Sequence, residues 1–564
     1  MRRFLSLIVG TQFIMFSIVN ATNVSGIIST NTVWNTTGSP YIVTGNVLVD
    51  TLVTLTIQPG VEVKVNEAKY IMVKGILRAI GTSSDSIIIT KNGTAGWSRL
   101  WLRTASICSL KYCRIEYADS TAIYNDDNGS FYVGYCTISN NPVPSMMPSV
   151  YCINNYKGSA VIINSTISNN SGAINTSEGN YGSAIIVGNT ITNNSGYYGI
   201  LSNYSNSGSA IISGNIVSNT SGTGIYNWMG TGKIVGNTII GNTRGGIYNV
   251  CVIDSLTIAG NTISNNGSAN DENFGSIYSK SDSLPDFPHL LTIRYNRITD
   301  TTYSAIHLKS NFNTLIRTNN IYATGYTFYN NDTLDIDVKY NYLNSLNTDT
   351  IDAKIYDYYD DFSKGKVLYQ PFLNTPFIDT TAPSAPINLT STKLAGSKFR
   401  INWTNPADSS GIAIYYYKVG SAPTFNFDIS GVFYSIPDTL FSTGGELYVW
   451  LQDGSGNLNY QNNTSVMLGI EESSELKVKS LELQISKNPF IKSTTIKFSV
   501  GNRHVCSLKI YDITGNCVKT LVNEKKDAGN YEASFDTKGL ASGIYFAKLS
   551  AGNISINKKL ILMK

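Results

Sequence analysis

The chain has 564 residues, of which 14% are charged, and a formal net charge of +4. So small a charge over this length excludes the electrostatic footprint of a nucleic-acid-binding protein, and no zinc-ligand spacing, Walker loop or dinucleotide fingerprint stands out. The length allows several domains, and the low charge together with 36 Tyr suits a β-rich protein with an uncharged surface.

Residues 1–21 are predicted to be a signal peptide. Met1-Arg-Arg3 precedes an apolar stretch over residues 4–19, and Val19-Asn-Ala21 offers small residues for cleavage, so the mature chain should begin near Thr22. A membrane anchor at this segment is the alternative. No later stretch is apolar enough to span a bilayer.

One short phrase recurs down the first two-thirds of the chain, with gaps of 23, 29, 24, 26, 22, 24, 35, 23 and 22 residues between successive copies. Such self-similarity predicts a solenoid. The copies are Cys113-Arg-Ile115, Cys136-Thr-Ile138, Ser165-Thr-Ile167, Asn189-Thr-Ile191, Asn215-Ile-Val217, Asn237-Thr-Ile239, Asn261-Thr-Ile263, Asn296-Arg-Ile298, Asn319-Asn-Ile321 and the weaker Asn341-Tyr-Leu343.

Each repeat holds three short pieces: the phrase, a Gly-Ile-Tyr-Asn piece such as Gly224 to Asn227, and an aliphatic run such as Ser183-Ala-Ile-Ile-Val187. We expect all three to alternate inward aliphatic with outward polar residues, as strands do, with Gly, Asn and Ser at the bends. Three strands in about 22 residues is the geometry of a right-handed parallel β-helix. About eleven or twelve coils between residues 40 and 375 would make a rod roughly 55 Å long.

The first residue of each phrase is predicted to form a structural ladder, because equivalent positions of successive coils stack on one another. An Asn amide can bond the next Asn and the backbone of the turn, and small Cys or Ser side chains fit the same narrow site. These residues are therefore poor candidates for catalysis. The ladder consists of Cys113, Cys136, Ser165, Asn189, Asn215, Asn237, Asn261, Asn296, Asn319 and Asn341.

Residues 22–378 resemble secreted right-handed parallel β-helix repeat proteins, through the repeats and through opening segments such as Leu55-Thr-Ile-Gln-Pro-Gly-Val-Glu-Val-Lys64 and Gly75-Ile-Leu-Arg-Ala-Ile-Gly81. The resemblance implies the fold. It leaves the function open, because such rods serve as polysaccharide lyases or hydrolases and as non-catalytic surface proteins.

Residues 379–470 begin with a Pro/Thr linker and then resemble a fibronectin type III or related immunoglobulin-like sandwich. The marks are Phe399-Arg-Ile-Asn-Trp403 and the late strand Glu446-Leu-Tyr-Val-Trp-Leu-Gln-Asp453. Trp403 is expected to be the buried core aromatic, with sugar stacking as the alternative. Residues 471–480 form a charged linker.

Residues 481–564 resemble the C-terminal sorting domain of the bacterial type IX secretion system. Matching pieces in order include Asn488-Pro-Phe490, Leu508-Lys-Ile-Tyr-Asp-Ile-Thr-Gly515 and Gly539-Leu-Ala-Ser-Gly-Ile-Tyr-Phe546. The resemblance implies a small β-sandwich that the export machinery reads, and a secreted or cell-surface location. It assigns sorting roles to Asn488, Pro489, Gly515, Gly529, Gly543 and Lys564.

Seven cysteines in an exported chain leave at least one thiol without an intramolecular partner. Cys113 and Cys136 would be stacked neighbours, either bridged or as buried thiols. Cys506 and Cys517 flank an expected hairpin and could also pair.

Neither the Asp-and-His pattern of polygalacturonases nor the Asp-rich and Arg-Pro pattern of calcium pectate lyases is present, so the sequence offers no recognisable catalytic constellation. No cofactor or metal is expected, and Ca²⁺ has no supporting motif. A divergent polysaccharide lyase or glycoside hydrolase stays open, with His307 or Lys309 as weak candidates for its base and an Arg to neutralise a uronate.

Arg294, Arg317 and Lys339 each stand two residues before a ladder Asn, and we expect them to stack on one outward face. Like charges so close repel, so nearby acids, solvation or a bound anionic glycan must offset them. Tyr226 and Tyr248 occupy equivalent places in adjacent coils and either stabilise the rod or stack sugar rings.

Together these features predict an all-β chain, a β-helix followed by two small sandwiches, exported through the periplasm and outer membrane. Its expected partners are the secretion machinery and a polysaccharide or cell-surface glycan. A binding or surface-contact role is favoured; a divergent enzyme and a structural rod are the alternatives.

Overall fold

The computed structural model describes residues 21–104, 106–142, 151–176, 183–203, 209–250, 255–267, 275–280, 290–299, 303–309, 313–468, 482–500, 504–526, 529–551 and 554–563. Two compact units make up the chain: residues 1–391 with 400–468, and residues 392–399 with 469–564. The predicted signal peptide, the 471–480 linker and Lys564 lie outside the described residues, apart from Ala21.

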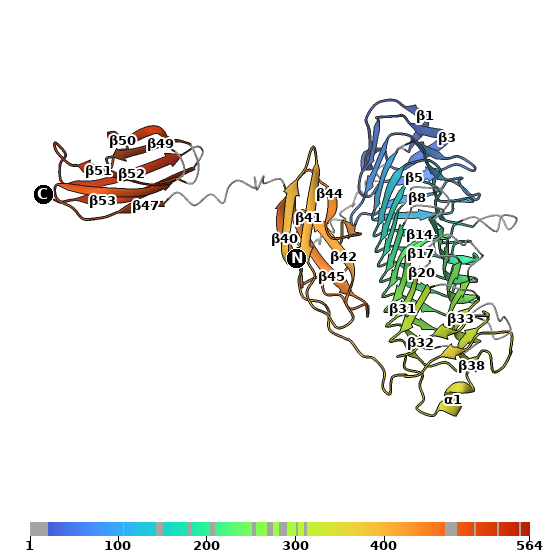
Figure 1. Ribbon diagram of the computed structural model, residues 1–564. Coiled ribbons are helices and arrows are strands. Elements are labelled where there is room, and N and C mark those ends of the chain that lie inside the picture. Colours follow the sequence, from blue (N-terminus) through green and yellow to red (C-terminus); the bar gives the residue numbers. More distant parts are fainter. Residues whose placement is uncertain are drawn as a thin grey trace, which may run out of the picture. The chain divides into compact units, whose positions relative to one another are not determined.

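The first unit contains a parallel β-helix of about twelve coils with three faces, and Figure 1 shows its strands stacked from blue through yellow. The strands β1 (Thr22–Ile28) and β3 (Tyr41–Val49) begin it, and β3 pairs with the first strands of two faces. The predicted all-β class and β-helix are confirmed.

One face of the β-helix is a 12-stranded parallel sheet within the described residues. We call it the docking face, because the sandwich described below packs against it. Its strands are β2 (Thr32–Trp34), β4 (Thr54–Ile57), β7 (Ile76–Ile80), β10 (Ile107–Lys111), β13 (Ser130–Gly134), β16 (Ser159–Ile163), β19 (Ala184–Val187), β22 (Ser209–Ser213), β25 (Thr231–Val235), β28 (Ser255–Ala259), β31 (Leu290–Arg294) and β34 (Asn313–Arg317).

The repeat face carries the recurring phrase. Its strands are β5 (Glu62–Val65), β8 (Ile87–Lys91), β11 (Cys113–Glu116), β14 (Thr137–Ser139), β17 (Thr166–Ser168), β20 (Thr190–Thr192), β23 (Ile216–Ser218), β26 (Thr238–Ile240), β29 (Thr262–Ser264), β32 (Arg297–Thr299) and β35 (Asn320–Ile321).

The aromatic face follows the repeat face in each coil. Its strands are β6 (Ile71–Val73), β9 (Leu100–Leu102), β12 (Ile123–Asn125), β15 (Ile153–Asn155), β18 (Ile174–Thr176), β21 (Tyr198–Asn203), β24 (Thr223–Trp228), β27 (Gly245–Val250), β30 (Ile277–Lys280), β33 (Ser304–Leu308), β36 (Tyr326–Asn330) and β38 (Ile355–Tyr356).

The core of the β-helix is built from aliphatic side chains that stack in register. The phrase supplies one such stack, in which Ile115, Ile138 and Ile167 pair directly and have no exposed surface. Burying an aliphatic side chain of this size stabilises a fold by about 1.5–3 kcal/mol, so a column repeated in every coil favours in-register stacking over any slip.

The first residues of the phrases form a continuous hydrogen-bonded ladder. From Asn189 to Asn341, each side-chain amide donates to the Oδ1 of the next Asn at 2.9–3.0 Å. Above it, the Asn189 Oδ1 accepts the Ser165 N–H, the Ser165 Oγ accepts the Cys136 N–H and the Cys136 Sγ accepts the Cys113 N–H.

Two further ladders run beside it that sequence reasoning missed. Asn141, Asn170 and Asn194 stack where the repeat face ends, and Asn227 and Asn249 stack where the aromatic face ends. The sequence signal for the first of these was an Asn three residues after the aliphatic residue of five phrases, at Asn141, Asn170, Asn194, Asn242 and Asn266.

A cap closes the C-terminal end of the β-helix. It consists of β37 (Ile336–Asp337), α1 (Thr348–Asp352), β38 and β39 (Val367–Leu368), which pairs with β37. Ile351, Ile355 and Val367 are buried against the core, so they cap the last coil.

The docking face corrects one expectation: the strands that the sandwich covers, such as β19 and β22, do not alternate inward aliphatic with outward polar residues. Ile185 and Ile211 point outward, yet they are 8% and 2% exposed. They pack against the sandwich residues Ala413, Tyr416 and Trp450 in a second core. A continuous apolar run such as Ala184–Val187 is typical of a strand that is buried on both sides.

The sandwich has a three-stranded sheet, β40 (Ile387–Lys393), β41 (Lys398–Thr404) and β44 (Asp438–Phe441). Its four-stranded sheet contains β43 (Gly431–Phe433), β42 (Ile412–Val419), β45 (Gly445–Asp453) and β46 (Thr464–Leu468). Trp403 is 3% exposed, as predicted for the core aromatic. The resemblance to fibronectin type III stays a prediction.

Polar groups also join the sandwich to the docking face. The Tyr416 hydroxyl lies 2.9 Å from both the Ser213 Oγ and the Gln452 Oε1. Lys233 donates to the carbonyl of Ala413, and burial, followed by the charge of Arg294, lowers the pKa of Lys233. Burial raises the pKa of Tyr416.

One turn column explains why glycine occurs where it does. The residue before each ladder position has φ between +47° and +67°, and Tyr112, Asn164 and Thr318 adopt this conformation without being glycine. Glycine occupies the column only at 188, 214, 236 and 260, where a Cβ would meet Phe427, Gln452 or the backbone of Ser455. Close approach of the sandwich, rather than the backbone angle, therefore requires these four glycines.

The second unit contains two antiparallel sheets. One has β47 (Glu482–Ile485), β48 (Ser493–Val500) and β51 (Gly529–Asp536); the other has β50 (Cys517–Lys526), β49 (His504–Tyr511), β52 (Gly543–Ala551) and β53 (Ile554–Leu562). Among the predicted sorting residues, Asn488 precedes Pro489 and bonds the backbone of Lys559 and Ile561. Gly515 turns with φ +89° between β49 and β50.

The cysteines in the described residues are all free thiols, so neither proposed bridge is formed. Cys113 and Cys136 are buried ladder residues in which one thiol accepts the backbone N–H of the other. Cys506 is buried and Cys517 is exposed. Across the strand pair β49 and β50, Cys506 stands opposite Glu524 and Cys517 stands opposite Tyr511, so the two cysteines do not face each other.

The ladder should depend on the acceptor at each position. Asn237→Val leaves the backbone N–H of Asn215 and one of its two Nδ2 hydrogens without an acceptor, while the other stays bonded to the Ile186 carbonyl. Each buried donor that loses its acceptor costs about 1–3 kcal/mol, so the two together should lower the free energy of unfolding by about 2–6 kcal/mol. Asn237→Ser should cost less, because Ser165 fills the same site. Urea unfolding followed by circular dichroism measures both; equal losses would contradict this account.

The glycine column should depend on the sandwich. Gly260→Asn keeps a residue that tolerates positive φ but places its Cβ against Ser455 and Gly456, which should weaken docking by about 1–3 kcal/mol. Gly241→Asn is the control, because Gly241 has φ +68° and its Cβ would meet only Asn219. Faster proteolysis between residues 379 and 386 in Gly260→Asn alone is the expected result, and equal rates would refute it.

Candidate functional site

Three basic residues, Arg294, Arg317 and Lys339, lie at and just beyond the C-terminal end of the docking face and are called the basic row. Arg294 and Arg317 are partners in register on β31 and β34, and Ile293 and Ile316 beside them point inward with no exposed surface. Lys339 follows β37 rather than continuing the strand. Arg317 and Lys339 lie 3.3 and 3.4 Å from one shared carboxylate, that of Asp337.

The row continues the column that the sandwich covers. In register, the outward position reads Ile163, Val187, Ser213, Val235 and Ala259 and then Arg294 and Arg317. The five upper residues have no exposed surface. The side chains therefore change from small or apolar to cationic where the cover ends.

Both arginines rest on tyrosine rings. The guanidinium carbons of Arg294 and Arg317 lie 5.2 Å from the ring centroids of Tyr295 and Tyr340. The Arg294 Nε is buried without a hydrogen-bond partner in the part of the chain that the structure describes. Arg317 and Lys339 therefore share one carboxylate and Arg294 adds a third cation beside them, which leaves the row with surplus positive charge.

The aromatic face carries a column of stacked rings. Tyr226, Tyr248, Tyr278, His307, Tyr329 and Tyr356 occupy equivalent positions on successive strands. Tyr226 and Tyr248 stack at 5.1 Å and 14°, and Tyr329 and Tyr356 at 4.2 Å and 5°. Because neighbouring rings occupy the faces of these rings, the geometry favours a stabilising column over a sugar-stacking platform.

The two candidates for a catalytic base lie away from the basic row. His307 is 1% exposed between Tyr278 and Tyr329, at ring distances of 4.7 and 4.5 Å. Lys309 is exposed just after β33. His307 lies on the aromatic face and Lys309 directly after it, whereas Arg294 and Arg317 lie on the docking face, so the structure does not assemble them into one centre.

A cavity of about 620 Å³ opens beside Lys339 in the cap of the β-helix. Its lining combines apolar residues of β38 and β39 with charged and aromatic side chains, including Asp352, Asp360, Lys366, Tyr359 and Tyr369. The Tyr369 hydroxyl donates to Asp352 at 2.7 Å. Burial and this carboxylate raise the pKa of Tyr369.

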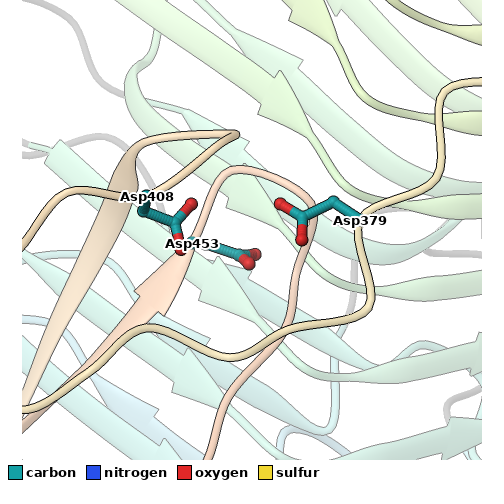
Figure 2. Close-up of side chains that lie close together, drawn as sticks. All are labelled: Asp379, Asp408 and Asp453. Carbon is teal, nitrogen blue, oxygen red and sulfur yellow. The ribbon is translucent and has the colours of Figure 1, made fainter.

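Three carboxylates converge in the sandwich, as Figure 2 shows. Asp379 lies before β40, Asp408 between β41 and β42, and Asp453 at the end of β45; one oxygen from each lies within 4.8 Å of the others. Carboxylate oxygens are the ligands that Ca²⁺ prefers, so these residues could hold a divalent cation. The expectation of no metal stays a prediction.

Asp453 is the buried member of this group. Its pKa is raised to about 6, chiefly by burial and also by the charges of Asp408 and Asp379, against the opposing effect of hydrogen bonds from Asn457. The Asn457 N–H and Nδ2 donate to the two oxygens at 2.7 and 2.8 Å.

Sequence reasoning missed both the cavity and the carboxylate group. The acidic and aromatic run from Tyr356 to Phe362 could have indicated the cavity, because it breaks the Asn/Ser/Thr composition of the coils. Asp379, Asp408 and Asp453 are spaced irregularly, and only the fold brings them together.

The family comparisons identify two segments. Residues 98–263 match the right handed beta helix region, and residues 487–563 match the secretion system C-terminal sorting domain. The chain is an exported β-helix protein. Its tail directs it to the type IX secretion machinery, so it is secreted or held at the cell surface. No helix in the described residues is long and apolar enough to cross a bilayer.

Solved structures resemble this β-helix protein only distantly. A mutant of the periplasmic alginate epimerase AlgG is 10% identical over 59% of this chain and 78% of that chain, with a TM-score of 0.37. Tailspike protein 2 of the Escherichia coli O157:H7 bacteriophage CAB120 is 12% identical over 95% and 70%, with a TM-score of 0.18. Dimeric latent PorU from Porphyromonas gingivalis is 14% identical over 36% and 23%, with a TM-score of 0.14. No curated protein matches the sequence.

The sandwich should become less stable as pH rises from about 4 to about 6. With its pKa raised, Asp453 keeps a proton in the folded state that the unfolded chain releases near pH 4, so the folded state is favoured below this window. Urea unfolding followed by the fluorescence of Trp403 and Trp450, with EDTA present, measures the slope. Asp453→Asn should flatten it; an unchanged slope would assign it to other groups.

Proposed function

We propose that this exported β-helix protein binds an acidic polysaccharide outside the cell, through Arg294, Arg317 and Lys339. The observation that carries the proposal is the surplus charge of the basic row, where Arg317 and Lys339 share the carboxylate of Asp337 and Arg294 stands in register beside Arg317. Carboxylate or sulfate groups along a polymer would supply the missing counter-charges.

Two further features support a polymer over a small anion. The two arginines stand on adjacent strands, which lie about 4.8 Å apart, so they offer a short linear array of donors. Their guanidinium groups are held over Tyr295 and Tyr340, which limits the side-chain entropy that binding must remove.

The basic row should discriminate polymers by charge. Arg294→Gln with Arg317→Gln should weaken binding to polygalacturonate by about tenfold, and rising salt should weaken the parent protein in the same direction. Pull-down on acidic and neutral polysaccharides measures retention, and the same samples are read for new reducing and unsaturated ends.

Arg103→Gln with Arg114→Gln is the matched control, because each of these arginines already pairs with its own acid, Asp126 or Glu116. Equal retention of both double variants would refute the proposal. New ends would favour a lyase or hydrolase, and neither retention nor ends would favour a structural rod.

A further inference from the structure

The cavity in the cap of the β-helix has the make-up of a sugar site. Its apolar lining includes Ile355, Val367 and Leu368, and its volume of about 620 Å³ falls within the range of small-molecule sites. Polar side chains share the lining with these apolar residues, and such a combination can fix the orientation of a bound ring.

Tyr359 supplies an aromatic face that the tyrosines of the stacked column do not. It lines the cavity and is 74% exposed. In the described residues its ring meets only Tyr358 edge-on, at 5.6 Å and 83°, and the Lys366 Nζ at 5.6 Å. The C–H face of a pyranose can therefore stack on it, because no other ring among the described residues lies parallel to it.

Carboxylates and an ammonium group provide the polar contacts. One oxygen of Asp352 accepts the Tyr369 hydroxyl, and one oxygen of Asp360 accepts the Asp357 N–H. The second oxygen of each has no partner in the described part of the chain and can accept from sugar hydroxyls. Lys366 can donate to a hydroxyl or ring oxygen.

The charges of the cavity select the class of sugar. Asp352, Asp357 and Asp360 line it, against Lys366 and a Lys339 that is already paired with Asp337. This negative balance disfavours a uronate or sulfated ring, unlike the basic row. We infer that the cavity binds one neutral hexose ring of a glycan, with Tyr359 as its platform and Asp352 and Asp360 as its acceptors.

This site is tested apart from the basic row. The full chain is titrated with the methyl glycosides of glucose, galactose and mannose, with N-acetylglucosamine and with glucuronate, by calorimetry and saturation-transfer NMR. At least one neutral sugar should bind, and Tyr359→Ala should weaken it at least tenfold. Asp352→Asn, which keeps the shape of the side chain, should weaken it several-fold.

Phe362→Ala is the matched control, because Phe362 is 79% exposed and contacts Tyr358 without lining the cavity. Unchanged thermal unfolding of the variants separates binding from folding. No binding by any neutral sugar, equal binding by Tyr359→Ala and Phe362→Ala, or tighter binding of glucuronate would each overturn the inference. The row is tested on acidic polymers and the cavity on neutral sugars, so either can fail alone.

Discussion

Hydrogen bonding between successive coils holds the β-helix in register, and the Asn ladders complete it at the bends. A strand ladder alone satisfies the backbone only along the faces, and each bend would leave buried donors and acceptors open. The Asn189-to-Asn341 column fills this need with one side chain a coil, which accepts from the coil above and donates to the coil below. Because the register is fixed in this way, every outward residue has a defined neighbour one coil away.

The outward column of the docking face depends on that register. From Ile163 to Ala259 it is small or apolar and lies under the sandwich, and at Arg294 it becomes cationic. The turn column beside it holds Gly188, Gly214, Gly236 and Gly260 under the sandwich, and its next member, Tyr295, still lies against Gly454 of the sandwich. The sandwich therefore covers part of the docking face of the β-helix. The basic row begins at the C-terminal end of the covered column.

Charge is scarce in this protein, so its placement carries information. The basic row has more cations than acids, whereas the cap cavity has more acids than cations, and Lys339 contributes to both. The two sites would suit different sugars in one glycan, the first by ion pairing and the second by stacking and hydroxyl contacts. The aromatic face takes no part in either proposal, because its rings stack on one another.

The sequence by itself determined the all-β class, the parallel coils, the first Asn ladder and the sorting tail, because each is written as a local or periodic pattern. Periodicity also indicated which way Arg294 and Arg317 point. It did not reveal that Ile185 and Ile211 are buried by the sandwich, since their cover comes from residues more than 200 positions later. The cap cavity and the approach of Asp379, Asp408 and Asp453 were likewise decided only by the tertiary structure, because contacts between distant, non-repeating segments leave no period in the chain.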